Sequence, residues 1–194
     1  MNDTISYYNQ NAEEYFDKTV NVSMRDLYDE FEEYLKPGDK ILDLGCGSGR
    51  DSRFFLSKGY DVVSVDGSRE MCRLAEKYIG RDVRNITFAE LDYNNEFDAV
   101  WASASLVHVD IGEIIDVMFK IQRALKKNGI LYASWKYGTG ERVDNQKYYA
   151  DFEEETISEL FASASFDIKK MWVTEDNLVR DCKWINVIGV SKKK

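Results

Sequence analysis

The sequence predicts an α/β protein in which helices cover a mostly parallel, seven-stranded sheet. Short apolar segments alternate with segments of helical periodicity from Lys40 onward, the order of elements that produces such a sheet. The chain has 194 residues, 44% of them hydrophobic, so it can bury one core without disulfides or a metal. A turn signal at Pro37 separates a helical N-terminal segment, residues 1–36, from the sheet, residues 37–194. We therefore expect a single domain.

Each strand is predicted by a short apolar run that ends at a turn residue. In the second expected strand, Val62, Val63 and Val65 suit burial on both faces, and Asp66 follows them. The seven strands are expected at residues 40–44, 61–65, 85–89, 97–102, 130–135, 167–173 and 184–190.

The helices are predicted by apolar residues at spacings of three and four. Ser68 is expected to cap one helix and Gly80 to end it, and Gly129 is expected to end the next. Helices are expected at residues 51–58, between 68 and 80, at 112–125 and at 153–164.

Charge and cysteine content argue against several classes of function. The net charge of −9 repels a nucleic-acid backbone, so a nucleic-acid partner is not expected. Cys46, Cys72 and Cys182 show no zinc spacing, which predicts no metal site and fits a reducing cytoplasm. There is no signal peptide and no apolar run of roughly 18 residues, so we expect a cytoplasmic protein with no membrane partner.

A glycine-rich turn follows the first expected strand. In ILDLGCGSG, Gly45, Gly47 and Gly49 lie between a strand and a helix, where they let the backbone approach a ligand closely. Asp66 ends the second strand, about 20 residues after the first glycine, where a carboxylate accepts hydrogen bonds from both ribose hydroxyls. The pattern indicates a bound nucleoside.

The charge of Asp43 favours one nucleoside over another. This carboxylate precedes Gly45 by two residues and would repel the pyrophosphate of a dinucleotide held at the turn. S-adenosylmethionine would present an ammonium and a sulfonium there, which the carboxylate attracts. The sequence therefore favours a methyl donor over a nicotinamide cofactor.

These motifs resemble those of the class I S-adenosylmethionine-dependent methyltransferases, from roughly Tyr7 to Trp135. ILDLGCGSG resembles the first motif of that family, Val65-Asp66-Gly67-Ser68 its ribose segment and Leu91-Asp92 its adenine-contacting segment. The resemblance implies a Rossmann-like fold with strand order 3-2-1-4-5-7-6, the last strand antiparallel. It also implies S-adenosylmethionine as cofactor and S-adenosylhomocysteine as product.

The resemblance further assigns residues to the cofactor. Asp66 would hold the ribose, Met71 would pack on the adenine face, and Asp92 would accept a hydrogen bond from the adenine amino group. The implied cofactor residues are Asp43, Gly45, Cys46, Gly47, Gly49, Asp66, Gly67, Met71, Leu91, Asp92 and Ala102. Arg50-Asp51 resembles small-molecule methyltransferases of the tellurite-resistance and thiopurine type; helix electrostatics alone predicts Asp51 at a helix N-terminus with Arg50 as its surface partner.

Two residues are candidates for a catalytic role in methyl transfer. Methyl transfer mainly requires the acceptor atom about 3 Å from the methyl carbon, opposite sulfur. His108, the sole histidine, follows the fourth expected strand at the ligand-binding edge and is a candidate base. Tyr15 lies in an aromatic segment that forms a lid in similar small methyltransferases, where its ring would favour the sulfonium.

The acceptor is expected to be a small molecule, because the chain has no large insertion. No Asn/Asp-Pro-Pro-Tyr/Phe motif follows the fourth strand, which argues against adenine-N6 and glutamine substrates. An aromatic and cationic loop after the fifth strand would choose the substrate together with the N-terminal segment. The candidate substrate residues are Tyr8, Trp135, Lys136, Tyr137 and Arg142.

Three other functions also fit the sequence. They are a tRNA or RNA base methyltransferase, a NAD-dependent oxidoreductase that uses the same turn and Asp66, and a non-catalytic nucleoside-binding module. A monomer and a homodimer both fit the sequence.

Overall fold

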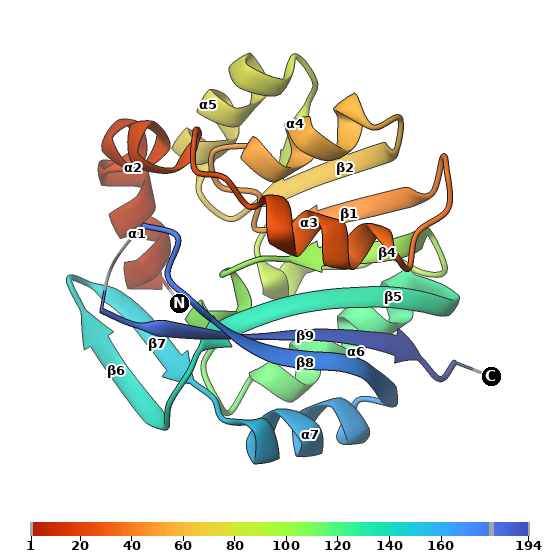
Figure 1. Ribbon diagram of the computed structural model, residues 1–194. Coiled ribbons are helices and arrows are strands. Elements are labelled where there is room, and N and C mark those ends of the chain that lie inside the picture. The colour runs from red at the N-terminus through yellow and green to blue at the C-terminus, as the bar shows by residue number, and fades with distance from the viewer. Residues whose placement is uncertain (1, 179–180, 194) are drawn as a thin grey trace.

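The computed structural model describes residues 2–178 and 181–193 and has three layers, a twisted sheet with helices on both faces (Figure 1). The seven strands of the sheet lie in the order β3-β2-β1-β4-β5-β9-β8. β9 runs antiparallel to both of its neighbours, and the other pairs are parallel. Since β8 and β9 are the sixth and seventh strands of this sheet, the predicted order is confirmed.

The central strands are buried on both faces, as their apolar runs require. In β1, Ile41 and Leu42 have no exposed surface, and each belongs to a different core cluster. The strands of the sheet are β1 (Lys40–Leu44), β2 (Asp61–Asp66), β3 (Val83–Asn85), β4 (Phe97–Ala102), β5 (Leu125–Lys136), β8 (Phe166–Glu175) and β9 (Lys183–Ser191).

The helices divide the core into two sides. On one side, Phe31 of α3 (Arg25–Glu32) and Phe55 of α4 (Arg50–Ser57) pack against Trp101 of β4. On the other side, α6 (Ile114–Ala124) and α7 (Glu154–Ser163) cover the sheet (Figure 1).

The predicted caps of α5 (Arg69–Ile79) are confirmed. Ser68 accepts a hydrogen bond from the backbone N–H of Met71 at 3.2 Å, and Gly80 ends the helix with a φ of +71°. The helix packs beside β2 and β3, and its N-terminus lies at the carboxyl end of β2.

The N-terminal segment forms three helices. α3 belongs to the core, whereas α1 (Asn2–Gln10) and α2 (Ala12–Thr19) lie at the carboxyl edge of the sheet and contact α5 (Figure 1). The chain therefore places its first two helices over the edge at which ligands bind in open α/β sheets.

The third strand and its continuation differ from the prediction. β3 ends at Asn85, and the next residues form a short 3₁₀ helix, η1 (Phe88–Glu90). Thr87 and Glu90 form a reciprocal capping box, which stabilises this turn in place of a longer strand.

The polar stretch after β5 forms a hairpin that we expected to be a loop. β6 (Gly140–Asp144) and β7 (Lys147–Asp151) pair through a turn at Asn145 and Gln146, both with positive φ. Because every residue of β6 is exposed, this strand has no apolar alternation to reveal it in the sequence. β5 also begins earlier than predicted, and Asn128 takes the left-handed conformation expected of Gly129.

Candidate active site

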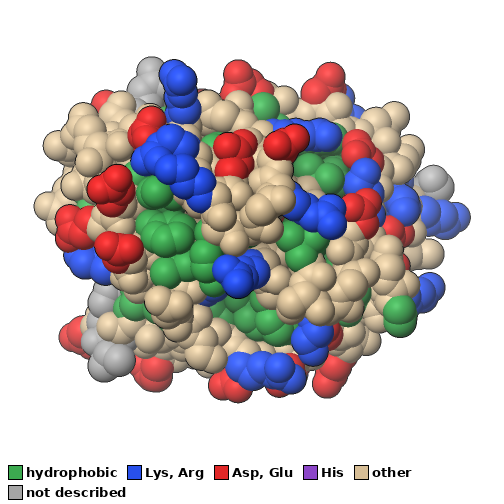
Figure 2. Space-filling model, turned by 90° about the horizontal axis from the view of Figure 1, so that it is seen from above, with side chains coloured by type: hydrophobic (Ala, Val, Ile, Leu, Met, Phe, Trp, Pro, Cys, Tyr) green, Lys and Arg blue, Asp and Glu red, His purple; other side chains and the backbone are tan. Residues whose placement is uncertain are grey.

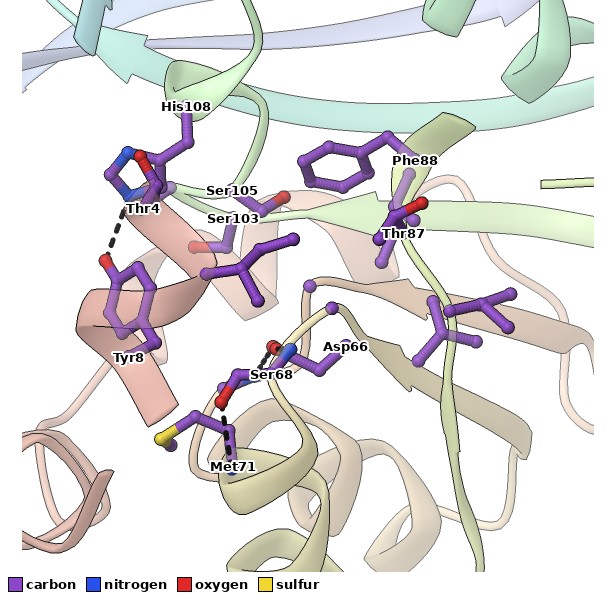
Figure 3. Close-up of a pocket in the computed structure, with 18 of the residues that line it drawn as sticks. Thr4, Tyr8, Asp66, Ser68, Met71, Thr87, Phe88, Ser103, Ser105 and His108 are labelled. Atoms are coloured by element: carbon purple, nitrogen blue, oxygen red, sulfur yellow. Dashed lines mark hydrogen bonds between the residues drawn. The ribbon is translucent and has the colours of Figure 1, made fainter. Parts of the chain in front are cut away.

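A cavity of about 750 Å³, including its open mouth, lies at the carboxyl ends of β1, β2 and β4, beside α1. Figure 3 shows Tyr8 and His108 on one side of it and Thr87 and Phe88 on the other, with Asp66 between them. The lining residues are Thr4, Ile5, Tyr8, Tyr15, Leu44, Gly45, Gly47, Val65, Asp66, Gly67, Ser68, Met71, Ile86, Thr87, Phe88, Ser103, Ala104, Ser105 and His108.

The glycine turn forms one wall of this cavity. Gly45 has a φ of +77°, and a Cβ added there would stand 2.5 Å from the Cβ of Ser105, so only glycine fits. Gly47 lies beside Tyr15, which a Cβ would approach to 3.6 Å. Gly49 does not line the cavity, because it packs against Ile79 and Ala75 of α5.

Asp66 faces the cavity from the end of β2, as predicted. Its Oδ2 accepts a hydrogen bond from the backbone N–H of Gly47 at 2.9 Å, and its Oδ1 accepts one from Ser68 at 2.8 Å. Burial raises the pKa of Asp66, and these two N–H groups oppose the shift. Each carboxylate oxygen retains acceptor capacity, so the group can bind a diol.

The end of the cavity beside η1 is largely apolar. Phe88 lines the cavity there, together with Ile86 and Thr87, and Met71 lines it farther away, beside Ser68 (Figure 3). Met71 is 1% exposed, so its thioether is fixed in position at the wall. A flat ring such as a purine suits this lining.

Asp92 and Leu91 lie outside the cavity, contrary to their expected place at the adenine. The Asp92 side chain is 90% exposed and pairs with Arg123 at 2.8 Å, and Leu91 is buried in the core. The cause is the η1 turn, which brings Thr87 and Phe88 to the wall instead.

Asp43 also lies elsewhere than expected. Its carboxylate is buried beneath the turn, where its Oδ2 accepts a hydrogen bond from Ser52 at 2.5 Å, and it lines neither this cavity nor its neighbour. Burial and the nearby charge of Asp51 raise the pKa of Asp43 well above that of an ordinary carboxyl. The expected attraction between Asp43 and a cationic ligand therefore has no geometric support.

Asp51 carries the negative charge that we expected of Asp43. Although burial opposes its ionisation, Arg50 pairs with it, and Tyr28 (2.6 Å) and Trp101 (2.8 Å) donate hydrogen bonds to it. Together these partners hold the pKa of Asp51 below its ordinary value. The predicted surface pair is thus a buried network that fixes the Arg50 guanidinium.

A second cavity adjoins the first across Gly45, Gly47, Ser103 and Ala104. Tyr15 lines both cavities and so lies at the boundary between them. The wall of the second cavity includes Cys46, Ser48, Arg50, Asp51, Ser134 and Asn186. We predicted no role for Ser48, Ser103, Ser134 or Asn186. Ser48 lies within the glycine-rich motif, whereas the other three belong to no motif that we used.

His108 is held from two sides. Its Nδ1 lies 2.7 Å from the backbone carbonyl of Tyr148, and its Nε2 lies 2.9 Å from the hydroxyl of Tyr8. Burial lowers the pKa of His108 to about 4, assisted by the charges of Lys147 and Lys136. The imidazole is therefore neutral near pH 7.

The structure brings Tyr8, a candidate substrate residue, and Tyr15, a candidate catalytic residue, to the cavity. It leaves the other candidate substrate residues outside the cavity. The Tyr8 and Tyr15 rings meet edge to face at 4.9 Å. Trp135 and Ala102 are fully buried in the core, because β4 and β5 are covered on both faces. The remaining candidates, Lys136, Tyr137 and Arg142, are not among the residues that line either cavity.

The hairpin explains where two of these side chains go. Lys136 lies over the Tyr149 ring at 4.2 Å from its centroid, and Arg142 pairs with Asp151 across the β6–β7 ladder. Tyr149 in turn contacts the ring of His108 at 4.9 Å. The loop that we expected to bind substrate instead packs behind His108.

Comparison with known proteins finds a methyltransferase family model that matches part of the chain. A family model described as "Methyltransferase domain" matches residues 41–129, which include the glycine turn, Asp66 and His108. Over this segment the chain is similar to class I S-adenosylmethionine-dependent methyltransferases.

Several methyltransferases are similar to this chain in sequence. The Bacillus subtilis (strain 168) methyltransferase homologue YqeM is 28% identical over 155 residues, covering 70% of this chain and 60% of that protein. An uncharacterized methyltransferase of Staphylococcus carnosus (strain TM300) is 26% identical over 158 residues, covering 74% of each chain. The malonyl-[acyl-carrier protein] O-methyltransferase of Enterobacter lignolyticus is 29% identical over 98 residues, 37% of its length. The chain thus spans from about a third to three quarters of these relatives.

Solved structures share the fold. The Burkholderia thailandensis 1,6-didemethyltoxoflavin-N1-methyltransferase, solved with its substrate and S-adenosylhomocysteine, has a TM-score of 0.80 at 23% identity, covering 99% of this chain and 87% of that one. A methyltransferase from Haloferax volcanii, in complex with the activator Trm112, has a TM-score of 0.78 at 16% identity, covering 99% and 97%.

The residues present fit S-adenosylmethionine, the cofactor that the motifs imply. The cavity offers a carboxylate for a ribose at Asp66, a largely apolar lining for a purine, and a wall at Gly45 that has no room for a Cβ beside Ser105. The buried Oγ of Ser105 lines the same cavity and has no hydrogen-bond partner among the described residues, so it is available to a ligand.

Other kinds of site were also sought in the part of the chain that the structure describes. There, no group of His, Cys, Asp and Glu residues could hold a metal ion. No helix among residues 2–178 and 181–193 is both long and apolar enough to cross a bilayer.

Proposed function

We propose that the protein transfers a methyl group from S-adenosylmethionine to a small-molecule acceptor. The observation that carries this proposal is the continuity of the two cavities past Asp66, the glycine turn and Tyr15. The first cavity suits a nucleoside. α1 borders it at Tyr8, and α2 borders both cavities at Tyr15, which favours a small acceptor over a polymer. The Burkholderia enzyme of the same fold acts on a small heterocycle, which supports this class of acceptor.

The donor would lie with its adenosine in the first cavity. Asp66 would accept from the ribose hydroxyls, Met71 and Phe88 would contact the adenine, and Gly45 and Gly47 would border the methionine chain. Arg50, fixed by Asp51 at the wall of the second cavity, would pair with the donor's carboxylate. α1 and α2 would act as a lid, since they supply Tyr8 and Tyr15, whereas α3 belongs to the core.

The chemistry that the donor supplies is an electrophilic methyl group on a sulfonium. The chain's own contribution is to hold the acceptor near that methyl and to exclude water. Tyr15, at the boundary of the two cavities, would place its aromatic ring near the sulfonium charge. His108 would act as the base when the acceptor must lose a proton.

Calorimetry with S-adenosylhomocysteine and with NAD tests the donor site on the same preparation. We expect binding of the former and none of the latter. Binding of NAD alone would instead support an oxidoreductase. Incubation with methyl-labelled donor and a deproteinised cell extract then tests transfer, which a non-catalytic nucleoside-binding module would not perform.

An RNA acceptor is the second candidate, and charge argues against it. The net charge of −9 opposes nucleic-acid binding, and a salt-dependent gel shift with tRNA would overturn that argument. We further propose a cytoplasmic location, since Cys46 and Cys72 are not in disulfides. A monomer or homodimer suffices, because the described residues of one chain already complete the two cavities.

A further inference from the structure

The hydrogen bonds of His108 fix which of its ring nitrogens carries the proton. The carbonyl of Tyr148 can only accept, so Nδ1, 2.7 Å away, must donate to it. A neutral imidazole with its proton on Nδ1 has a lone pair on Nε2. The 2.9 Å bond to Tyr8 therefore runs from the tyrosine hydroxyl to Nε2.

Tyr8 consequently stands between the cavity and the base. Its donor is committed to His108, which leaves the phenolic oxygen as an acceptor at the cavity wall (Figure 3). An acceptor molecule in this cavity meets the Tyr8 oxygen on the path to Nε2. A proton can reach His108 only if Tyr8 accepts it and passes its own proton on.

We propose that Tyr8 relays the acceptor's proton to His108, and that the acceptor's reacting atom is a hydroxyl oxygen or a conjugated N–H nitrogen. This proposal rests on the methyl transfer proposed above and names its substrate class. It also makes Tyr8 a catalytic residue.

The relay balances in protons and electrons. The acceptor's lone pair forms the new bond to the methyl carbon, whose former bonding pair to sulfur remains on the donor. The acceptor's proton passes to the Tyr8 oxygen as the Tyr8 hydroxyl proton passes to Nε2. Tyrosine ends neutral, and the resulting imidazolium returns its proton to water after product release.

The surroundings of the pair select the acceptor's chemistry. Burial disfavours an imidazolium most, the charges of Lys147 and Lys136 add to this, and Tyr149 packs against the ring, so His108 is a weak base. Such a base removes a proton only from a group that becomes strongly acidic as the methyl bond forms. A hydroxyl and an amide-like or heteroaromatic N–H do so, because neither atom holds its proton once it carries a positive charge.

Other acceptors do not need this pair. A methylated aliphatic amine has a pKa near 10 and keeps its proton in the presence of His108. A thioether or a metalloid anion has no proton to lose. Burial raises the pKa of Tyr8, which keeps it protonated and able to relay.

The single histidine makes the hydrogen-bond arrangement directly measurable. In protein labelled with ¹⁵N-histidine, all side-chain imidazole signals belong to His108. We expect the pattern of the Nδ1–H tautomer in the protein bound to S-adenosylhomocysteine, and a shift of the Nε2 resonance in Tyr8→Phe. Tyr7→Phe is the matched control, because Tyr7 lies on the same helix, faces Lys147 and does not line the cavity. An Nε2–H tautomer, or an Nε2 resonance indifferent to Tyr8→Phe, would overturn the relay.

A methyl-transfer assay of the same variants provides the second test of the relay. Wild type, Tyr7→Phe, Tyr8→Phe and His108→Asn are incubated with methyl-labelled donor and a deproteinised cell extract, and labelled products are identified by mass spectrometry. We expect O-methyl or conjugated N-methyl products, and a loss of about 100-fold or more in Tyr8→Phe and His108→Asn at unchanged S-adenosylhomocysteine affinity. Label on sulfur, a metalloid or an aliphatic amine contradicts the proposed class. Absence of S-adenosylhomocysteine binding in wild type would refute the proposed function instead, and the same resonance measurement on the ligand-free protein would still decide the relay.

Discussion

The carboxylate of Asp66 and the backbone N–H of Gly47 are joined by a hydrogen bond of 2.9 Å. This bond ties the end of β2 to the turn after β1, so the expected ribose partner and the expected methionine wall form one rigid unit. A second bond, from the N–H of Ser68 at 2.8 Å, fixes the other carboxylate oxygen. A change at Asp66 should therefore affect the turn as well as the ribose.

Replacement of Asp66 tests the ribose assignment. Asp66→Ala removes a charged acceptor from the wall, and we expect affinity for S-adenosylhomocysteine to fall by about 1 to 3 kcal/mol. Calorimetry measures this loss. The same loss is expected for 5′-methylthioadenosine, which keeps the ribose. Unchanged affinity for both ligands would place the ribose elsewhere.

Replacement of Arg50 tests the opposite end of the donor. Arg50→Lys keeps a positive charge beside Asp51 but lacks the planar fork that makes two bonds at once. We expect it to weaken S-adenosylhomocysteine binding by about 1 kcal/mol, roughly half of what a charged hydrogen bond contributes. 5′-Methylthioadenosine has no carboxylate, so its affinity should not change and serves as the control for folding. An equal loss for both ligands would mean that Arg50 acts only through the stability of the site.

The sequence was sufficient for the parts of the fold that follow from apolar burial. β1, β2 and β4 are largely buried, and their mainly apolar sequences predicted them within a residue. β6 could not be predicted in this way because all of its residues are exposed. The shift of β3 had a local cause, since the capping box of Thr87 and Glu90 competes with the strand.

The ends of strands and the tight turn predicted which residues line the cavity better than the charges of the side chains did. Gly45 and Asp66 line the cavity because a strand end and a tight turn fix both positions. The position of Asp43 is also set by its strand. Because successive side chains of a strand point to opposite faces, the Asp43 side chain points under the turn toward Ser52. The bond between Tyr8 and His108 joins residues 100 positions apart, and no local pattern encodes such a contact.

The close approach at Gly45 predicts a specific loss of stability. In Gly45→Ala the new Cβ would stand 2.5 Å from the Cβ of Ser105, in addition to a left-handed backbone. The left-handed backbone costs an alanine about 1 to 2 kcal/mol, and the clash with Ser105 costs about 1 to 3 kcal/mol. Urea unfolding should therefore show a loss of about 2 to 5 kcal/mol, the sum of those two ranges.

Gly59 supplies the control for that measurement. It also has a positive φ, +89°, but a Cβ added there meets nothing within 4 Å. Gly59→Ala should show only the cost of the left-handed backbone, about 1 to 2 kcal/mol. If the free energy of unfolding falls equally in the two variants, the close approach to Ser105 does not contribute to the loss.

The raised pKa of Asp43 predicts how stability depends on pH. Because burial and Asp51 raise the pKa of Asp43, the folded state holds a proton that the unfolded chain releases above about pH 4. The folded protein then binds more protons than the unfolded one, so this group lowers the free energy of unfolding as pH rises from about 4 toward its folded pKa. Asp43→Asn keeps the shape of the protonated acid and cannot ionise. We expect the variant to gain stability relative to wild type at pH 8 and little at pH 5, in urea titrations at both values.

Asp51 affects the pH dependence of stability in the opposite direction, so pH titrations can distinguish the two carboxylates. Its pKa is lowered, so its contribution to stability is present above the ordinary carboxyl pKa of about 4 and is lost as pH falls through the folded value. Asp51→Asn leaves the buried Arg50 without its counter-charge and should destabilise the protein by about 3 to 5 kcal/mol at pH 7. The two substitutions are the same in chemistry and lie in one buried cluster, yet one should stabilise and the other should destabilise. A loss of stability at pH 8 in Asp43→Asn would show that Asp43 is ionised in the folded protein, which would restore it as a source of charge near the turn.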